Sequence, residues 1–229
     1  MIFEELKKYI SNYIVNSDNN KILLAFSGGL DSCVLLHALN IYNNEFKLDI
    51  SCLHINYQQH KNSNIAEEHC RQTCNKYNNK FISIKSKPII KNFEHNARIY
   101  RYKKLINYSN KNNINIILTA HHLDDQIETI YMKVKNNSDW VSKIGIRSEY
   151  GKIKRPFLNI QKSILFKYSK TFNIKFVKDL SNNNINYLRN DIRINQLPKM
   201  RISRPNIDQE LIEIKNKSLK KLEIFNKNI

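Results

Sequence analysis

Two short stretches of this sequence combine residue types that could bind and transform a phosphorylated compound. Residues 27–32 read SGGLDS and contain two of the four glycines of the chain. Glycine lets a backbone turn sharply and approach a ligand closely, so that amide N–H groups can point at a phosphate. Residues 119–129 read TAHHLDDQIET and place imidazoles beside carboxylates. Such carboxylates can hold Mg²⁺ through oxygen or water, and groups of both kinds can transfer protons.

Each stretch also has a purely structural interpretation. The first can be an ordinary strand-to-helix turn with Asp31 or Ser32 as the helix cap, and the acids of the second can cap a helix as well. The first stretch is neither a Walker loop nor a dinucleotide-binding loop, because no Gly-Lys-Ser/Thr follows and the G-x-G-x-x-G spacing is absent. The second lacks the H-E-x-x-H spacing, so a catalytic zinc is not expected.

The elements around these stretches alternate between strand and helix patterns. Lys21–Phe26 is a continuous apolar run, typical of a strand buried on both faces. The following segments predict strands at 49–56, 81–84 and 115–120 and helices at 31–39, 63–77, 93–112 and 124–134. This order predicts an α/β fold with a mainly parallel sheet and helices on both faces. Because ligands bind beyond the carboxyl ends of such strands, both stretches are expected at one site.

Composition limits the kinds of partner. The 229 residues contain 38 Lys and Arg against 20 Asp and Glu, a net charge of +18, which favours a polyanion such as RNA. A general drift of the amino-acid composition toward lysine and asparagine is an alternative explanation for part of this positive charge. The four cysteines form no C-x-x-C pair, and no apolar run approaches the roughly 20 residues of a membrane span. Met1–Tyr13 has the pattern of an amphipathic helix rather than of a signal peptide.

Basic residues appear in two further helical patterns. Arg98 lies four residues after Glu94, a spacing that suits either a surface ion pair or a phosphate-binding arginine. Arg189 and Arg193 are one helical turn apart and, with the cations that follow them, form a basic stripe suited to an RNA backbone. A solvated helix face explains that stripe equally well.

These motifs resemble known proteins. The 27–32 loop resembles that of the N-type ATP pyrophosphatases, and the order and spacing of further motifs resemble the tRNA(Ile)-lysidine synthase family of the PP-loop superfamily. The resemblance covers about Lys21 to Met200 and rests on these segments: 27–32, 53–56, 92–102, 119–129, 154–158, 178–182 and 187–193. The sequence departs from the family pattern at Tyr57–His60 and at Lys135–Trp140, where family glycines are missing.

The resemblance implies an adenine nucleotide alpha hydrolase-like, Rossmann-like fold and a specific reaction. ATP would adenylate C2 of the wobble cytidine in tRNA(Ile) with a CAU anticodon, and free L-lysine would displace AMP to form lysidine. It further implies Mg²⁺, a cytoplasmic or organellar (stroma or matrix) location, and a homodimer. The implied ATP-binding residues are Ser27, Gly28, Gly29, Leu30, Asp31 and Ser32. The implied catalytic residues are Asp31, Arg98, His121 and Asp125, with Asp31 and Asp125 as Mg²⁺ ligands. The implied RNA-binding residues are Arg155, Arg189, Asn190 and Arg193.

The resemblance also predicts the domain organisation. Residues 1–203 are expected to form the catalytic domain, and 204–229 a short helical extension in place of longer tRNA-binding domains. Two alternatives remain open. One is another tRNA-modifying enzyme of the same fold, such as a cytidine-thiolating enzyme, although that group carries the C-x-x-C pairs absent here. The other is a tRNA-binding relative that has lost catalysis.

Overall fold

The computed structural model describes residues 4, 7, 20–59, 62–89, 91–178 and 184–227. The predicted helix Met1–Tyr13 lies almost entirely outside the described residues. The chain forms two compact units. The first contains Met1–His121 and Ser148–Lys178, and the second contains His122–Arg147 and Asp179–Ile229. The predicted division after residue 203 stays a prediction, because compactness alone does not define a family domain.

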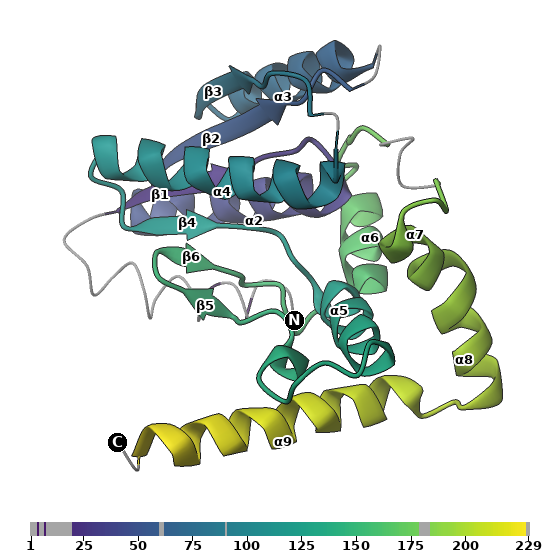
Figure 1. Cartoon of the computed structure of the whole chain (residues 1–229). Helices are drawn as coiled ribbons and strands as arrows, with labels where there is room; N and C mark the ends of the chain where they lie inside the picture. Colours follow the sequence, from purple (N-terminus) through teal and green to yellow (C-terminus); the bar gives the residue numbers. More distant parts are fainter. Residues whose placement is uncertain are drawn as a thin grey trace. The chain divides into compact units, whose positions relative to one another are not determined.

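The first unit is built around a sheet that, within the described residues, has six strands in the order β3-β2-β1-β4-β6-β5 (Figure 1). Neighbouring strands run parallel except for the short hairpin of β5 and β6. The strands are β1 (Lys21–Ala25), β2 (Asp49–Asn56), β3 (Lys80–Lys85), β4 (Ile116–Leu118), β5 (Glu149–Tyr150) and β6 (Ile153–Lys154). The predicted α/β class with a mainly parallel sheet is thus confirmed.

Helices cover both faces of this sheet. The helices whose full bounds are described in the first unit are α2 (Leu30–Phe46), α3 (Ser63–Lys76), α4 (Phe93–Lys111) and α6 (Lys162–Thr171). Because side chains alternate along a strand, Ile22 and Leu24 of β1 pack into a core with α2, α3 and α6. Leu23 points to the other face and packs with Leu105 of α4. Both faces of β1 are therefore buried, as its continuous apolar run predicts.

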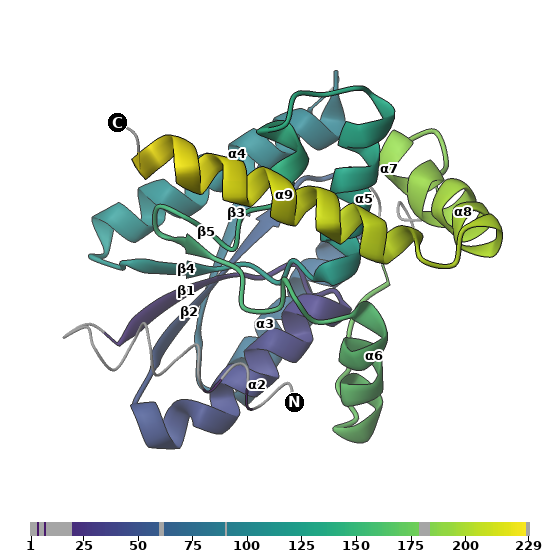
Figure 2. The ribbon, with the colours of Figure 1, turned by 90° about the horizontal axis from the view of Figure 1, so that it is seen from below.

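The second unit is helical. Its described elements are α5 (Leu123–Lys135), the 3₁₀ turn η2 (Ser142–Ile144), α7 (Leu188–Asp191), the π-helical turn η4 (Ile192–Gln196), α8 (Leu197–Ser203) and α9 (Ile207–Lys227). Its core joins Ile127 and Ile130 of α5 to Leu211 of α9. Figure 2 shows α9 as one continuous rod, which confirms the predicted helical C-terminal region. None of the helices in the described part of the chain is long and apolar enough to cross a membrane.

Candidate active site

The loop between β1 and α2 has the backbone geometry that the sequence predicts for a phosphate-binding turn. Gly28 adopts a positive φ of 77°, and a Cβ at this position would lie 2.7 Å from the Cys70 Sγ atom of α3. Gly29 caps α2 in an extended conformation, so the first turn of the helix begins directly after the glycines. Ser27 Oγ accepts a hydrogen bond from Gly29 N at 3.3 Å and lies 3.1 Å from Ser32 Oγ. The first-turn amides of α2 and its dipole are therefore placed where they could bind a phosphate, and phosphate binding by this loop stays a prediction.

Hydrogen bonds hold this loop from two sides. Phe26 N donates to Leu53 O of β2 at 2.9 Å, and Val177 N donates to Gly28 O at 2.9 Å. His54 Nδ1 donates to Phe26 O at 2.9 Å. Burial lowers the pKa of His54, and the bond to Phe26 opposes this only in part. A neutral imidazole at this place fixes the end of β1 without adding charge beside the loop.

A cationic cluster forms around Tyr102, a residue whose role the sequence did not single out. The guanidinium carbons of Arg98 and Arg101 lie 5.1 Å and 5.8 Å from the centre of the Tyr102 ring. Arg155, only 6% exposed, donates from Nη2 to the Tyr102 hydroxyl at 3.2 Å. Burial alone would raise the pKa of Tyr102, but the charges of Arg98, Arg155 and Arg101 outweigh it and lower the pKa. The structure thus brings together two predicted site residues, Arg98 and Arg155, in an arrangement that attracts anions.

His121 follows β4 at the end of the first unit. Its Nδ1 atom lies 2.8 Å from the Thr119 hydroxyl, so the side chain is held by a residue of the same motif. Thr119 is buried, and its backbone N–H donates to Lys154 O at 3.0 Å. The imidazole of His121 is therefore oriented at the carboxyl end of β4, where the sequence places it.

Asp125 lies in the second unit, in the first turn of α5. It forms a capping box with His122: Asp125 N donates to His122 Nδ1 at 3.3 Å, and His122 N donates to Asp125 Oδ2 at 3.0 Å. The other oxygen, Oδ1, accepts from Arg189 Nη2 at 2.9 Å. The capping interpretation of this acid is therefore correct. A role in Mg²⁺ binding stays a prediction, and at Oδ1 the metal would compete with Arg189.

Glu128 pairs with the two arginines that the sequence assigned to RNA. Its side chain is 3% exposed, and it accepts from Arg189 Nε at 2.9 Å and from Arg193 Nε at 2.6 Å. Arg193 Nη2 donates to the second carboxylate oxygen at 2.9 Å. Asn190, between the arginines, is buried and donates to Asn184 O at 2.9 Å. RNA binding by Arg189, Asn190 and Arg193 stays a prediction. The two arginine side chains form a charge-neutral network with the carboxylates of Asp125 and Glu128.

A buried polar group at the end of β2 was not found from the sequence. Glu67 of α3 is 8% exposed, and its Oε2 accepts from Asn56 Nδ2 at 2.7 Å. Burial alone would raise the pKa of Glu67, but the hydrogen bond from Asn56 and nearby positive charge outweigh it and lower the pKa. The burial of Glu67 could not be predicted from the sequence, because its neighbours along the helix are mostly polar. The group adds a fixed negative charge at the edge of the sheet where the loop lies.

The described residues contain no group of three or more His, Cys, Asp or Glu side chains that could hold a metal by themselves. A Mg²⁺ ion that accompanies a nucleotide needs only one or two carboxylates, because phosphates and water complete its shell. Asp31 meets this requirement, since it lies in the first turn of α2, two residues after Gly29. The residues present therefore fit a Mg²⁺ ion that is bound together with phosphates.

Comparisons with known proteins agree with this fold and loop. The chain belongs to the PP-loop domain family, whose profile matches residues 2–200. Similar proteins include the tRNA(Ile)-lysidine synthase of Buchnera aphidicola subsp. Schizaphis graminum, 40% identical over 81% of this chain and 43% of the relative. The tRNA(Ile)-lysidine synthase of Wigglesworthia glossinidia brevipalpis is 35% identical over 96% of this chain and 64% of the relative. The chain thus spans roughly half the length of the curated relatives that it matches.

Solved structures share the fold at low sequence identity. The U34-tRNA thiolase NcsA from Methanococcus maripaludis, solved with its [4Fe-4S] cluster, matches 97% of this chain and 78% of its own with a TM-score of 0.73 and 15% identity. The NH3-dependent NAD synthetase from Campylobacter jejuni matches 95% of this chain and 93% of its own, with a TM-score of 0.56 and 16% identity. At these identities the likeness supports the fold alone.

Proposed function

We propose that this protein is an ATP-dependent ligase that joins lysine to C2 of the wobble cytidine in tRNA(Ile) with a CAU anticodon. The observation that carries the proposal is the 27–32 loop, whose glycines turn β1 into the N-terminus of α2 in a chain similar to tRNA(Ile)-lysidine synthases. The loop is suited to phosphates, and the net charge of +18 suits an RNA substrate. The product would be lysidine, which converts a methionine anticodon into an isoleucine anticodon.

The reaction would proceed in two balanced steps. In the first, the C2 oxygen of the cytidine attacks the α-phosphorus of ATP, and pyrophosphate leaves. In the second, the ε-amine of free lysine attacks C2, loses a proton, and AMP leaves with the oxygen. Bound with the nucleotide, Mg²⁺ would neutralise phosphate charge.

Each predicted catalytic residue has a role in this scheme. The loop residues and Asp31 bind the phosphates and their cation, and Arg98 with Arg155 stabilises the charge that develops at the α-phosphate. His121, oriented by Thr119, accepts the proton of the lysine amine. For Asp125, which lies in the second unit, a role in orienting that amine is what the family resemblance suggests.

The experiment that tests the proposal follows labelled lysine into unmodified tRNA(Ile) with a CAU anticodon, with and without ATP. We expect ATP-dependent incorporation that is absent with the methionine tRNA of the same anticodon. Arg98→Ala should reduce it by about 100-fold, as expected for a lost charge-stabilising donor. Binding of the tRNA without incorporation or pyrophosphate release would contradict the proposal and support a non-catalytic relative. The same preparation, analysed by light scattering, tests the proposed homodimer.

Thiolation of the tRNA is the second candidate, because NcsA shares the fold. The cysteines of this chain argue against it. Cys33, Cys52, Cys70 and Cys74 are all buried, and burial raises the pKa of Cys33 to about 12. A sulfur relay needs an accessible, easily ionised thiol. Sulfur incorporation into the tRNA would overturn this argument.

A further inference from the structure

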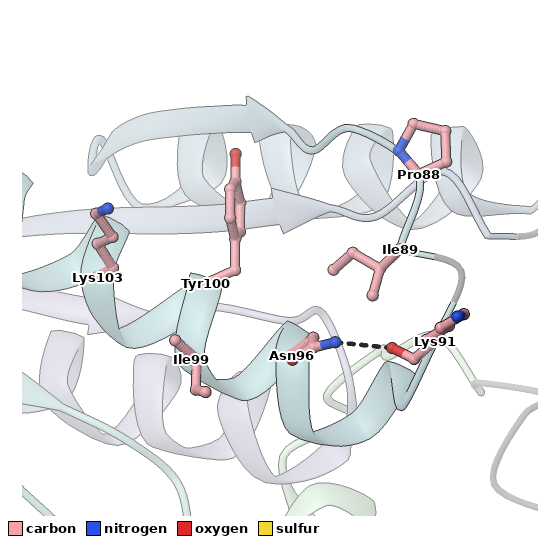
Figure 3. A pocket seen from close by; sticks show the side chains of 7 residues that line it. All are labelled: Pro88, Ile89, Lys91, Asn96, Ile99, Tyr100 and Lys103. Carbon is pink, nitrogen blue, oxygen red and sulfur yellow. Dashed lines mark hydrogen bonds between the residues drawn. The ribbon is translucent and has the colours of Figure 1, made fainter.

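A shallow pocket of about 430 Å³ lies on the first unit, between the segment that follows β3 and the first half of α4 (Figure 3). The wall from α4 consists of residues three and four positions apart, which therefore share one face of the helix. They are Asn96, Ile99, Tyr100 and Lys103. The facing wall consists of Pro88, Ile89 and Lys91.

The pocket combines an apolar floor with a positive rim. Pro88, Ile89, Ile99 and Tyr100 supply the apolar surface, and Ile99 keeps 54% of its area exposed. Lys91 and Lys103 are both exposed, and of the seven residues that line the pocket none is acidic. The Lys104 ammonium also lies 5.1 Å from the centre of the Tyr100 ring. A flat apolar surface flanked by ammonium groups fits an unstacked nucleobase with its phosphates.

Hydrogen bonds preform this pocket. Asn96 Nδ2 donates to Lys91 O at 2.8 Å and ties the loop to α4, as Figure 3 shows. Gln58 Nε2 donates to Ser86 O at 2.7 Å, and Gln59 Nε2 donates to Ile89 O at 3.4 Å. These glutamines belong to the segment in which the sequence departs from the tRNA(Ile)-lysidine synthase pattern. The departure therefore supplies side chains that brace one wall of the pocket.

We propose that the pocket holds one unpaired nucleotide of the RNA substrate. Its base lies against Ile89, Ile99 and Tyr100, and its phosphates lie near Lys91 and Lys103. The inference rests on the proposed function, because it adds a second contact to the same RNA. Arg98 is two positions from Tyr100 and so lies on the opposite side of α4 from the pocket. An α-helix is only about 10–12 Å across, so the bound nucleotide is one that flanks the reacting cytidine.

The ionic part of the proposal is tested by the salt dependence of RNA binding. We would measure binding of the full chain to a fluorescent anticodon stem-loop over a range of salt concentrations. Removing two phosphate contacts on a single strand, in the double variant Lys91→Ala/Lys103→Ala, should reduce the slope of log K against log salt by about 1.4. The matched control is Lys80→Ala/Lys111→Ala, which removes two exposed lysines of the same unit that do not line the pocket. Equal slopes for the two double variants would overturn the proposal.

The apolar part is tested by Ile99→Glu against Ile106→Glu. Ile106 lies on the same helix, is 39% exposed and does not line the pocket. Loss of one stacked base should weaken RNA binding by roughly 5- to 150-fold for Ile99→Glu alone. A stem-loop carrying 4-thiouridine beside the wobble position should also cross-link on illumination to the peptide that contains Ile99 and Tyr100.

The outcomes separate this inference from the proposed function. If the Ile99→Glu protein binds RNA as tightly as the Ile106→Glu protein, while the wild-type protein still incorporates lysine, the pocket assignment is overturned and the proposed function stands. Cross-linking to the pocket peptide in a protein that incorporates no lysine would support the pocket and contradict the proposed function.

Discussion

Replacement of Gly28 by alanine tests why glycine occupies the phosphate loop. Gly28 has a φ of 77°, and an added Cβ would lie 2.7 Å from Cys70 Sγ, well inside van der Waals contact. The left-handed conformation costs about 1–2 kcal/mol for a residue with a Cβ, and overpacking adds about 1–3 kcal/mol. We therefore expect Gly28→Ala to lower the free energy of unfolding by about 2–5 kcal/mol.

Gly151→Ala is the matched control for this prediction. Gly151 also has a positive φ, of 55°, but a Cβ there would meet no atom within 4 Å. Gly151→Ala should therefore lower the free energy of unfolding only by the cost of the left-handed backbone conformation, about 1–2 kcal/mol. Adding Cys70→Ala removes the clashing sulfur, so the double variant Gly28→Ala/Cys70→Ala should lose less stability than the sum of its parts. Urea unfolding followed by circular dichroism measures five proteins: the wild type, the single variants Gly28→Ala, Cys70→Ala and Gly151→Ala, and the double variant.

Two results would refute this reasoning. If Gly28→Ala costs no more than Gly151→Ala, the Cys70 sulfur does not restrict the loop. If the double variant is fully additive, the clash is relieved by backbone movement instead. Activity adds a second measurement, since a displaced loop should lose ATP-dependent pyrophosphate release in Gly28→Ala and retain it in Gly151→Ala.

Three further predictions concern the charged groups. Glu128→Gln should lower the free energy of unfolding by about 2–4 kcal/mol, because it removes a buried carboxylate charge on which two partly exposed arginines converge. Asp208→Asn breaks a more exposed pair and should lower it by under about 1 kcal/mol in the same urea titration. Burial lowers the pKa of His54, so its contribution to stability is complete above its unfolded pKa near 6.5 and is lost as pH falls. His54→Gln should therefore make the free energy of unfolding, measured by urea titration, depend less on pH between about pH 7.5 and 5. The slope should fall by at most about 1.4 kcal/mol per pH unit. Tyr102→Phe removes the acceptor of Arg155 and should slow pyrophosphate release about 3- to 10-fold with little change in stability; an unchanged rate would exclude the hydroxyl from the site.

The regular elements of the first unit were predictable from the sequence. The strand predicted at 49–56 is β2 as observed, and the helices predicted at 63–77 and 93–112 end within one residue of α3 and α4. These elements carry long apolar runs or clear helical periods. The hairpin of β5 and β6 was missed, because strands of two residues have no period that a sequence can display. Its position beside β4 depends on pairing in the folded sheet.

The candidate site was predictable in its residue types but less so in its contacts. The loop glycines and Asp31 have the predicted positions, because a local motif fixes them. The partners of Arg189 were not predictable: its side chain meets Glu128, 61 residues earlier in the chain, and spacing carries no information on such pairs. Tyr102 was missed as the centre of the arginine cluster, since an aromatic residue on a helix is usually part of a core.

The interleaving of the two units has a consequence for biosynthesis. The chain leaves the first unit after His121, returns at Ser148, and leaves it again after Lys178. A ribosome that emits about 5–20 residues per second therefore releases α5 before β6 exists to complete the sheet beside β4. Neither unit corresponds to one continuous stretch of chain, so a single proteolytic cut or gene truncation cannot isolate either of them whole. A cut or truncation at any one point therefore leaves residues of both units in one of the two fragments.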